Sequence, residues 1–256
     1  MAELSVIGFD SFQETTNGFI THAETPVHSH ALTEVINRYR RQANIVYRLD
    51  EIKKENWNKK WEASYQPIVV EKRCIVRASF HQPEHHYQIE IIIDPRMSFG
   101  TGHHETTYLM LAAQLDLDHN NKVVLDAGCG TGILSILAGK LKARKIIAYD
   151  NDKWVIKNVQ ENLTLNNTSA KVHLGTIQTL NLNTQFDIIL ANINKNILVA
   201  DIPYYSNLLM PDGDLLLSGF YLKDIEDIRL LAENNSLSFI ASKTRNDWAM
   251  AHFKKF

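Results

Sequence analysis

Short apolar runs alternate with longer amphipathic segments along the second half of the chain. Five of these runs predict strands, at residues 123–125, 145–148, 170–173, 187–190 and 215–217. Their nearly continuous apolar character is typical of parallel strands that helices cover on both faces. The pattern therefore predicts an α/β, doubly wound, Rossmann-like domain with right-handed crossovers. Two last strands, 237–244 and 248–254, predict a hairpin that ends the sheet with an antiparallel pair.

The first 53 residues follow a different pattern, with short elements in the order helix, strand, strand, helix, strand. A strand is expected at residues 7–12, and its partner begins at Gly18. A helix with one apolar face is expected from Ser29 through Gln42, and a further strand at Ile45–Leu49. This order matches most of a small α+β plait that has no strand before its first helix.

Residues 54–66 join these two regions. Trp57 and Trp61 are four residues apart, so they share one face of a helix, and Pro67 ends that segment. We interpret the segment as a linker helix whose tryptophans pack against a neighbour. Extended pieces between residues 68 and 93 belong to the second region, so the predicted domains are 1–53 and 67–256.

Charge and composition argue against binding to nucleic acid, a metal site and a membrane span. The chain has 27 basic and 29 acidic residues, so its net charge of -2 provides no field that draws it onto nucleic acid. Cys74 and Cys129 have no pairing pattern, and the adjacent histidines have no metal-ligand spacing, so no metal site is predicted. No apolar run approaches the length of about 18 residues that a membrane span needs. We expect a cytoplasmic protein without a membrane partner.

A glycine-rich turn follows the first strand of the doubly wound region. Residues 126–132 read Asp-Ala-Gly-Cys-Gly-Thr-Gly and lead into a helix, whose first N–H groups are free to face a ligand. A dinucleotide fingerprint needs a third glycine at the position of Ile133 when counted from Gly128, or of Ser135 when counted from Gly130. The fingerprint fails in both registers, which argues against a nicotinamide oxidoreductase.

Two polar residues end strands of the same region. Asp150 ends the next strand, 22 residues after Gly128, where a carboxylate can accept both ribose hydroxyls. Asn192 ends the fourth strand, where it can accept a hydrogen bond from an incoming amine or hold a cofactor. The segment after the third strand, residues 174–177, contains no acid. We therefore expect adenine to be read by backbone groups and apolar packing.

The pattern Asp-x-Gly-x-Gly-x-Gly at residues 126–132 resembles the first motif of the class I methyltransferases, where the turn packs under the methionine part of S-adenosylmethionine. Residues 94–107 resemble a segment of one family, the methyltransferases of ribosomal large-subunit protein eleven, often called PrmA. That segment reads Asp-Pro-x-x-x-Phe-Gly-Thr-Gly-x-His-x-Thr-Thr, and every fixed position is met here. The resemblance covers most of the chain and includes Asp247 and Trp248.

The resemblance implies the cofactor S-adenosyl-L-methionine, with contacts from Thr107, Gly128, Asp150 and Asn192, while His104 matches the family's histidine. It implies an N-methyltransferase that modifies lysine side chains, the N-terminal amine, or both, on ribosomal large-subunit protein eleven. Asn192 then orients the amine, and no acid or base is assigned. The alternatives are a class I methyltransferase that acts on RNA or a small molecule, and a protein that binds the cofactor without catalysis. The near-neutral charge argues against RNA.

The N-terminal region departs from the family. The family's small domain is a ferredoxin-like plait that opens with a strand and recognises the substrate, whereas this sequence begins already in the first helix. We expect either that the strand has been lost or that the sequence begins after it.

Overall fold

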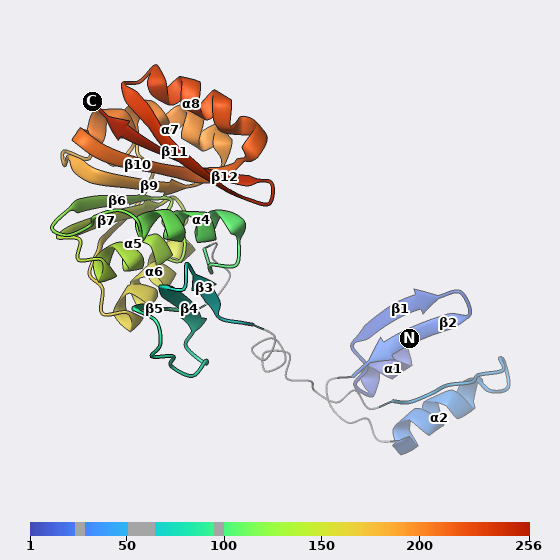
Figure 1. Ribbon diagram of the computed structural model, residues 1–256. Coiled ribbons are helices and arrows are strands. Elements are labelled where there is room, and N and C mark those ends of the chain that lie inside the picture. The colour runs from blue at the N-terminus through green and yellow to red at the C-terminus, as the bar shows by residue number, and fades with distance from the viewer. Residues whose placement is uncertain (24–28, 51–64, 95–99) are drawn as a thin grey trace. The chain divides into compact units, whose positions relative to one another are not determined.

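The computed structural model of the protein describes residues 1–23, 29–50, 65–94 and 100–256. The chain divides into two compact units, unit 1 from Met1 to Asn56 and unit 2 from Trp57 to Phe256 (Figure 1). The predicted linker helix with Trp57 and Trp61 lies outside the described residues, as does part of the 94–107 segment.

In its described residues, unit 1 has two short helices and one hairpin. Helix α1 (Ala2–Val6) precedes strands β1 (Ser11–Thr15) and β2 (Gly18–His22), which pair antiparallel, and α2 (Ser29–Tyr39) follows. Its buried core cluster is small and consists of Phe9, Leu32 and Ile36. The predicted order of the first four elements is therefore confirmed, but the first strand begins at Ser11 and runs to Thr15, so the predicted bounds 7–12 are wrong.

The predicted strand at Ile45–Leu49 is wrong. Residues 44–50 have no regular secondary structure. Val46 is 89% exposed and Leu49 is 53% exposed, whereas Ile45 packs against the small core of the unit without forming a strand. A strand needs a neighbour for its backbone hydrogen bonds. In the described part of unit 1, β1 and β2 form a two-stranded sheet with each other.

Unit 2 is built on a seven-stranded sheet in the order β11-β12-β10-β9-β6-β7-β8. Its strands are β6 (Val123–Ala127), β7 (Lys145–Asp150), β8 (Lys171–Leu174), β9 (Phe186–Asn192), β10 (Leu209–Tyr221), β11 (Leu237–Arg245) and β12 (Trp248–Lys255). The first five are parallel, and β12 pairs antiparallel with both β10 and β11. The predicted doubly wound α/β fold and its terminal hairpin are confirmed.

Helices cover both faces of this sheet, as Figure 1 shows. They are α4 (Glu105–Gln114), α5 (Ile133–Lys140), α6 (Lys153–Leu165), α7 (Lys195–Leu208) and α8 (Ile225–Glu233), with a short 3-10 helix, η1 (Leu222–Asp224). Alternate strand residues enter two separate cores because successive side chains point to opposite faces. Val124 packs with α4, α5 and α6, whereas Leu125 packs with α7 and α8.

Unit 2 also contains a three-stranded sheet that precedes the 94–107 segment in the chain. It consists of β3 (Ile68–Val70), β4 (Cys74–Ala78) and β5 (Ile89–Ile93), with β4 and β5 parallel. Two asparagines of unit 2 hold its last strand: Asn166 Oδ1 accepts from Ile92 N at 2.8 Å, and Asn162 Oδ1 accepts from Asp94 N at 2.9 Å. Asn162 also donates to the carbonyl of Thr131 at 2.9 Å. It thereby ties the start of the 94–107 segment to the glycine-rich turn.

Candidate active site

A cavity of about 830 Å³ opens at the carboxyl ends of the central strands of unit 2. Residues from the 100–107 segment, the glycine-rich turn, the ends of β7 and β9, the segment after β8, and α7 line it. The chain runs outward from β6 to β7 and β8, and then returns to β9 on the other side of β6. The cavity therefore lies where the strand order reverses, which is the usual ligand crevice of a doubly wound sheet.

The glycine-rich turn depends on glycine for its conformation and for its packing. Gly128, Gly130 and Gly132 have φ angles of 65°, 53° and 79°. A Cβ on Gly128 would lie 2.4 Å from Ile193 Cγ2, and one on Gly132 would lie 2.3 Å from Val159 Cγ2. The absent side chains thus let the turn pack against the β9–α7 loop and against α6, which the sequence pattern alone did not indicate.

Asp126, the first residue of the glycine-rich motif, stabilises the turn by hydrogen bonds to the helix that follows it. It is completely buried, and its Oδ2 accepts from the backbone N of Ser135 at 3.0 Å and from the Ser135 hydroxyl at 2.6 Å. These bonds join the end of β6 to α5. Burial raises the pKa of Asp126 to about 6.

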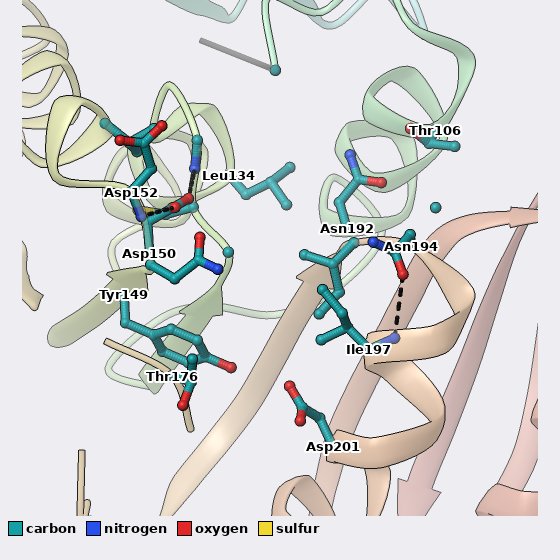
Figure 2. A pocket seen from close by; sticks show the side chains of 18 of the residues that line it. Thr106, Leu134, Tyr149, Asp150, Asp152, Thr176, Asn192, Asn194, Ile197 and Asp201 are labelled. Atoms are coloured by element: carbon teal, nitrogen blue, oxygen red, sulfur yellow. Dashed lines mark hydrogen bonds between the residues drawn. The ribbon is translucent and has the colours of Figure 1, made fainter. Parts of the chain in front are cut away.

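Asp150 lies on the cavity wall, at the end of β7 (Figure 2). Its Oδ2 accepts from Gly130 N at 3.1 Å, and its Oδ1 accepts from Asp152 N at 3.0 Å. The carboxylate is thereby fixed between the glycine-rich turn and the start of α6, and each oxygen keeps capacity for a further donor. Asp152 instead caps α6 by accepting from Trp154 N at 2.8 Å.

Asn192, which lines the cavity, forms a hydrogen-bonded pair with Thr107, which does not. Asn192 ends β9, and its Nδ2 donates to Thr107 Oγ1 at 3.3 Å. Its Oδ1 is buried and has no hydrogen-bond partner in the described part of the chain. A buried acceptor without a donor is uncommon and calls for a specific explanation.

The adjacent threonines Thr106 and Thr107 have different positions. Thr106 lines the cavity, whereas Thr107 is fully buried in α4 and contacts Asn192. The predicted cofactor contact of Thr107 stays a prediction, and so do those of Gly128, Asp150 and Asn192. Among these four, Gly128, Asp150 and Asn192 line the cavity itself.

Three aromatic side chains, His104, Trp248 and Tyr221, pack together near the start of α4. His104 caps α4 through Nδ1, which accepts from Thr106 N at 3.3 Å. Its ring forms a T-shaped contact with Trp248, with ring centroids 4.6 Å apart. Trp248 in turn stacks on Tyr221, with ring centroids 4.3 Å apart. Trp248 lines the cavity, although neither the pattern of the terminal hairpin nor the resemblance assigned it a place in the site.

Within the described ranges, no three His, Cys, Asp or Glu side chains gather as metal ligands. No helix in those ranges combines the length and the apolar character that a membrane crossing requires. Cys129 is a buried free thiol on the cavity wall, and burial raises its pKa well above the ordinary value.

These residues fit S-adenosylmethionine. A fixed carboxylate at Asp150 suits two ribose hydroxyls, and a buried acceptor at Asn192 suits a donor that enters with a ligand or substrate. The cavity is also large enough for a ligand of this size.

Comparison with known proteins agrees with this site. The family model described as ribosomal protein L11 methyltransferase (PrmA) matches residues 12–256. The ribosomal protein L11 methyltransferase of Phocaeicola vulgatus is 39% identical over 96% of this chain and 89% of its own length. That of Porphyromonas gingivalis is 42% identical over 98% of this chain and 88% of its own length.

Solved structures show the same fold. A ribosomal protein L11 methylase from Lactobacillus delbrueckii subsp. bulgaricus superposes with a TM-score of 0.69 at 26% identity, over 75% of this chain and all of that one. The 16S rRNA N2 G1207 methyltransferase of T. thermophilus, solved with AdoMet and guanosine, gives a TM-score of 0.54 at 20% identity. It covers 62% of this chain and 45% of that one, and shows the fold alone.

Proposed function

This chain belongs to the ribosomal protein L11 methyltransferase (PrmA) family, and we propose that it methylates amine nitrogens of ribosomal protein L11 at lysine side chains, the α-amine, or both. The methyl donor of this family of enzymes is S-adenosylmethionine. The proposed part is the choice of nitrogen and the role of each residue.

The buried carboxamide oxygen of Asn192 carries the proposal. Its amide nitrogen donates to Thr107, and its buried Oδ1 has no partner among the described residues, so Oδ1 is the atom we propose for accepting a hydrogen bond from the substrate amine. An oxygen acceptor orients an N–H donor, and so it suits an amine better than a carboxylate. Asn192 is uncharged and has no basic atom, so it positions the amine without taking its proton.

The chain's own residues act mainly by holding position. S-Adenosylmethionine, when bound, would supply a methyl group from its sulfonium sulfur. The leaving group is a neutral thioether, so the reaction needs no general acid. Asp150 holds the ribose, and Gly128 allows the close approach of the turn. Asn192 would orient the amine nitrogen for attack on the methyl group.

The attacking nitrogen must be uncharged. A lysine amine with a pKa of about 10.4 is mostly protonated at neutral pH, and an α-amine near 8 is less so. The proton leaves to a nearby acceptor or along water, since Asn192 cannot bind it. The methylation rate should therefore rise with pH toward the pKa of the amine.

Unit 1 is the proposed substrate-recognition part. The proposed cofactor-binding residues all lie in unit 2, between Thr107 and Asn192. Recognition of a folded ribosomal protein needs a further surface, and unit 1 supplies one. A ribosomal-protein substrate also agrees with the expected cytoplasmic location.

Mass spectrometry of ribosomal protein L11 tests the proposal. The protein is incubated with the enzyme and labelled S-adenosylmethionine, and an Asn192→Ala variant serves as the comparison. We expect label on lysine or α-amine nitrogens, and a large loss of rate in the variant. Label that is found only in RNA, or that base removes as an ester, would contradict it.

A further inference from the structure

A carboxylate that the sequence pattern left unassigned lies on the wall of the same cavity. Asp201 belongs to α7 and is 2% exposed. In Figure 2 its side chain extends from α7 toward the part of the cavity where Tyr149 and Thr176 lie. An ionisable group in such a place needs a reason, because burying a carboxylate is costly.

Three elements fix the position of Asp201. Gln178, in the segment after β8, donates from Nε2 to Oδ1 at 2.5 Å. The Tyr205 hydroxyl donates to Oδ2 at 3.1 Å and lies 3.1 Å from the hydroxyl of Tyr149 on β7. The acceptor is therefore rigid, and rigidity is what recognition of one particular donor requires.

The partners of Asp201 leave its hydrogen-bonding capacity incomplete. Each carboxylate oxygen can accept more than one hydrogen bond, and each receives one here from a neutral donor. Among the residues that the structure describes, no Lys or Arg side chain forms an ion pair with Asp201. Burial raises the pKa of Asp201, so the ionised form gains from a further donor.

The surroundings suit a flat heteroaromatic ring. Ile197, Ala200 and Asp201 are spaced i, i+3, i+4, so they share one face of α7, and all three line the cavity. Across from them the segment after β8 contributes Gly175 and Thr176. A ring that packs on the two apolar side chains places one edge near the carboxylate.

We propose that Asp201 reads the adenine of the cofactor by accepting a hydrogen bond from its exocyclic amine, with Gln178 as a positioning residue. This inference rests on the proposed function, because it needs the ribose to be held at Asp150. It replaces the expectation of backbone groups and apolar packing alone, because the acid belongs to α7 and not to the segment after β8.

Titration calorimetry with a pair of ligands at pH 8 tests the inference. S-Adenosylhomocysteine has the exocyclic amine, and S-inosylhomocysteine has a carbonyl oxygen there. The wild type should prefer the first by roughly tenfold or more, because the oxygen would face the carboxylate. Asp201→Asn can donate to that oxygen, so its preference should fall to within about threefold.

Asp152→Asn is the matched control, because Asp152 is another carboxylate on the same cavity whose side chain caps α6. Its ratio of the two affinities should equal that of the wild type. Equal binding of both ligands by the wild type would overturn the inference, and so would an unchanged ratio in Asp201→Asn. If that variant does not fold, Gln178→Met takes its place, and an unchanged ratio there has the same meaning.

The outcomes separate the inference from the proposed function. A wild type that binds S-adenosylhomocysteine and methylates ribosomal protein L11, but does not distinguish the two ligands, defeats the inference alone. A wild type that binds neither ligand defeats the proposed function, and the inference with it.

Discussion

Unit 1 and unit 2 differ in how much apolar surface each one buries. In unit 2, adjacent strand residues such as Val124 and Leu125 enter separate cores on the two faces of one sheet, and both are completely buried. Among the described residues of unit 1 the core cluster holds three buried residues, and Val46 is 89% exposed. Because apolar burial is the main stabilising contribution, unit 2 should resist unfolding more strongly than unit 1.

The difference matches the tasks we propose for the two units. Methyl transfer needs atoms held within fractions of an ångström, and the residues proposed for it belong to the unit with the larger core. Recognition of a protein surface can be carried out by a less stable unit such as unit 1.

Removal of unit 1 is the most direct test. A fragment from Pro67 to Phe256 should bind S-adenosylmethionine about as tightly as the whole chain, because every proposed cofactor residue is retained. Its methylation of ribosomal protein L11 should fall by about 100-fold or more, since the substrate is no longer positioned. Circular dichroism checks the fold of the fragment. Methylation at the rate of the whole chain would remove unit 1 from substrate recognition.

Two glycines with positive φ permit a matched comparison. Gly128 has φ 65°, and a Cβ there would lie 2.4 Å from Ile193, whereas Gly8 of unit 1 has φ 102° and nothing within 4 Å of its Cβ position. Gly128→Val should lower cofactor affinity by about 100-fold or more. Gly8→Val should leave affinity unchanged and cost about 1–3 kcal/mol of stability. Equal effects on affinity would show that the site does not depend on the turn.

The acid at the end of β7 comes next. Asp150→Ala should lower cofactor affinity by roughly 2–3 kcal/mol, or about 30–150-fold, because charge-assisted bonds to two hydroxyls are lost. Asp118→Ala is the control, since Asp118 also accepts a backbone N–H, from Asn120 at 2.9 Å, but does not line the cavity. Calorimetry that finds the same affinity for Asp150→Ala and the wild type would remove Asp150 from the site.

Asp126 should make the stability of the protein depend on pH. Its pKa is raised from 3.8 to about 6 in the folded protein, so between these values the native state binds more protons than the unfolded state. Stability from this group is therefore present at low pH and lost as pH rises from about 4 to 6. Asp126→Asn lacks that loss, and its stability relative to the wild type should rise by roughly 2–3 kcal/mol across the window.

Urea unfolding at several pH values measures this difference. All other titratable groups are shared by the two proteins, so the difference isolates Asp126. Parallel pH dependence in the two proteins would contradict the raised pKa.

Much of unit 2 could be predicted from its sequence. Strand periodicity and apolar runs are local properties, and they identified the parallel strands and the terminal hairpin. The glycine spacing at residues 126–132 identified the turn, because positive φ is a requirement of the backbone itself. Asp150 and Asn192 could be chosen because strand ends at the carboxyl edge of a parallel sheet face one crevice. In unit 1 the same reasoning failed at Ile45–Leu49, since a local pattern cannot supply a partner strand.

Contacts between distant segments were decided by the tertiary structure. Asn192 meets Thr107 across 85 residues, and Asp201 meets Gln178 across 23. The sheet order places β9 beside β6, and helix packing brings α7 against the segment that follows β8. The sequence determines which segments form strands, helices and turns through local backbone preference and periodicity. Only the packed fold decides which side chains share a cavity, because neighbours in space depend on the order and stacking of those elements.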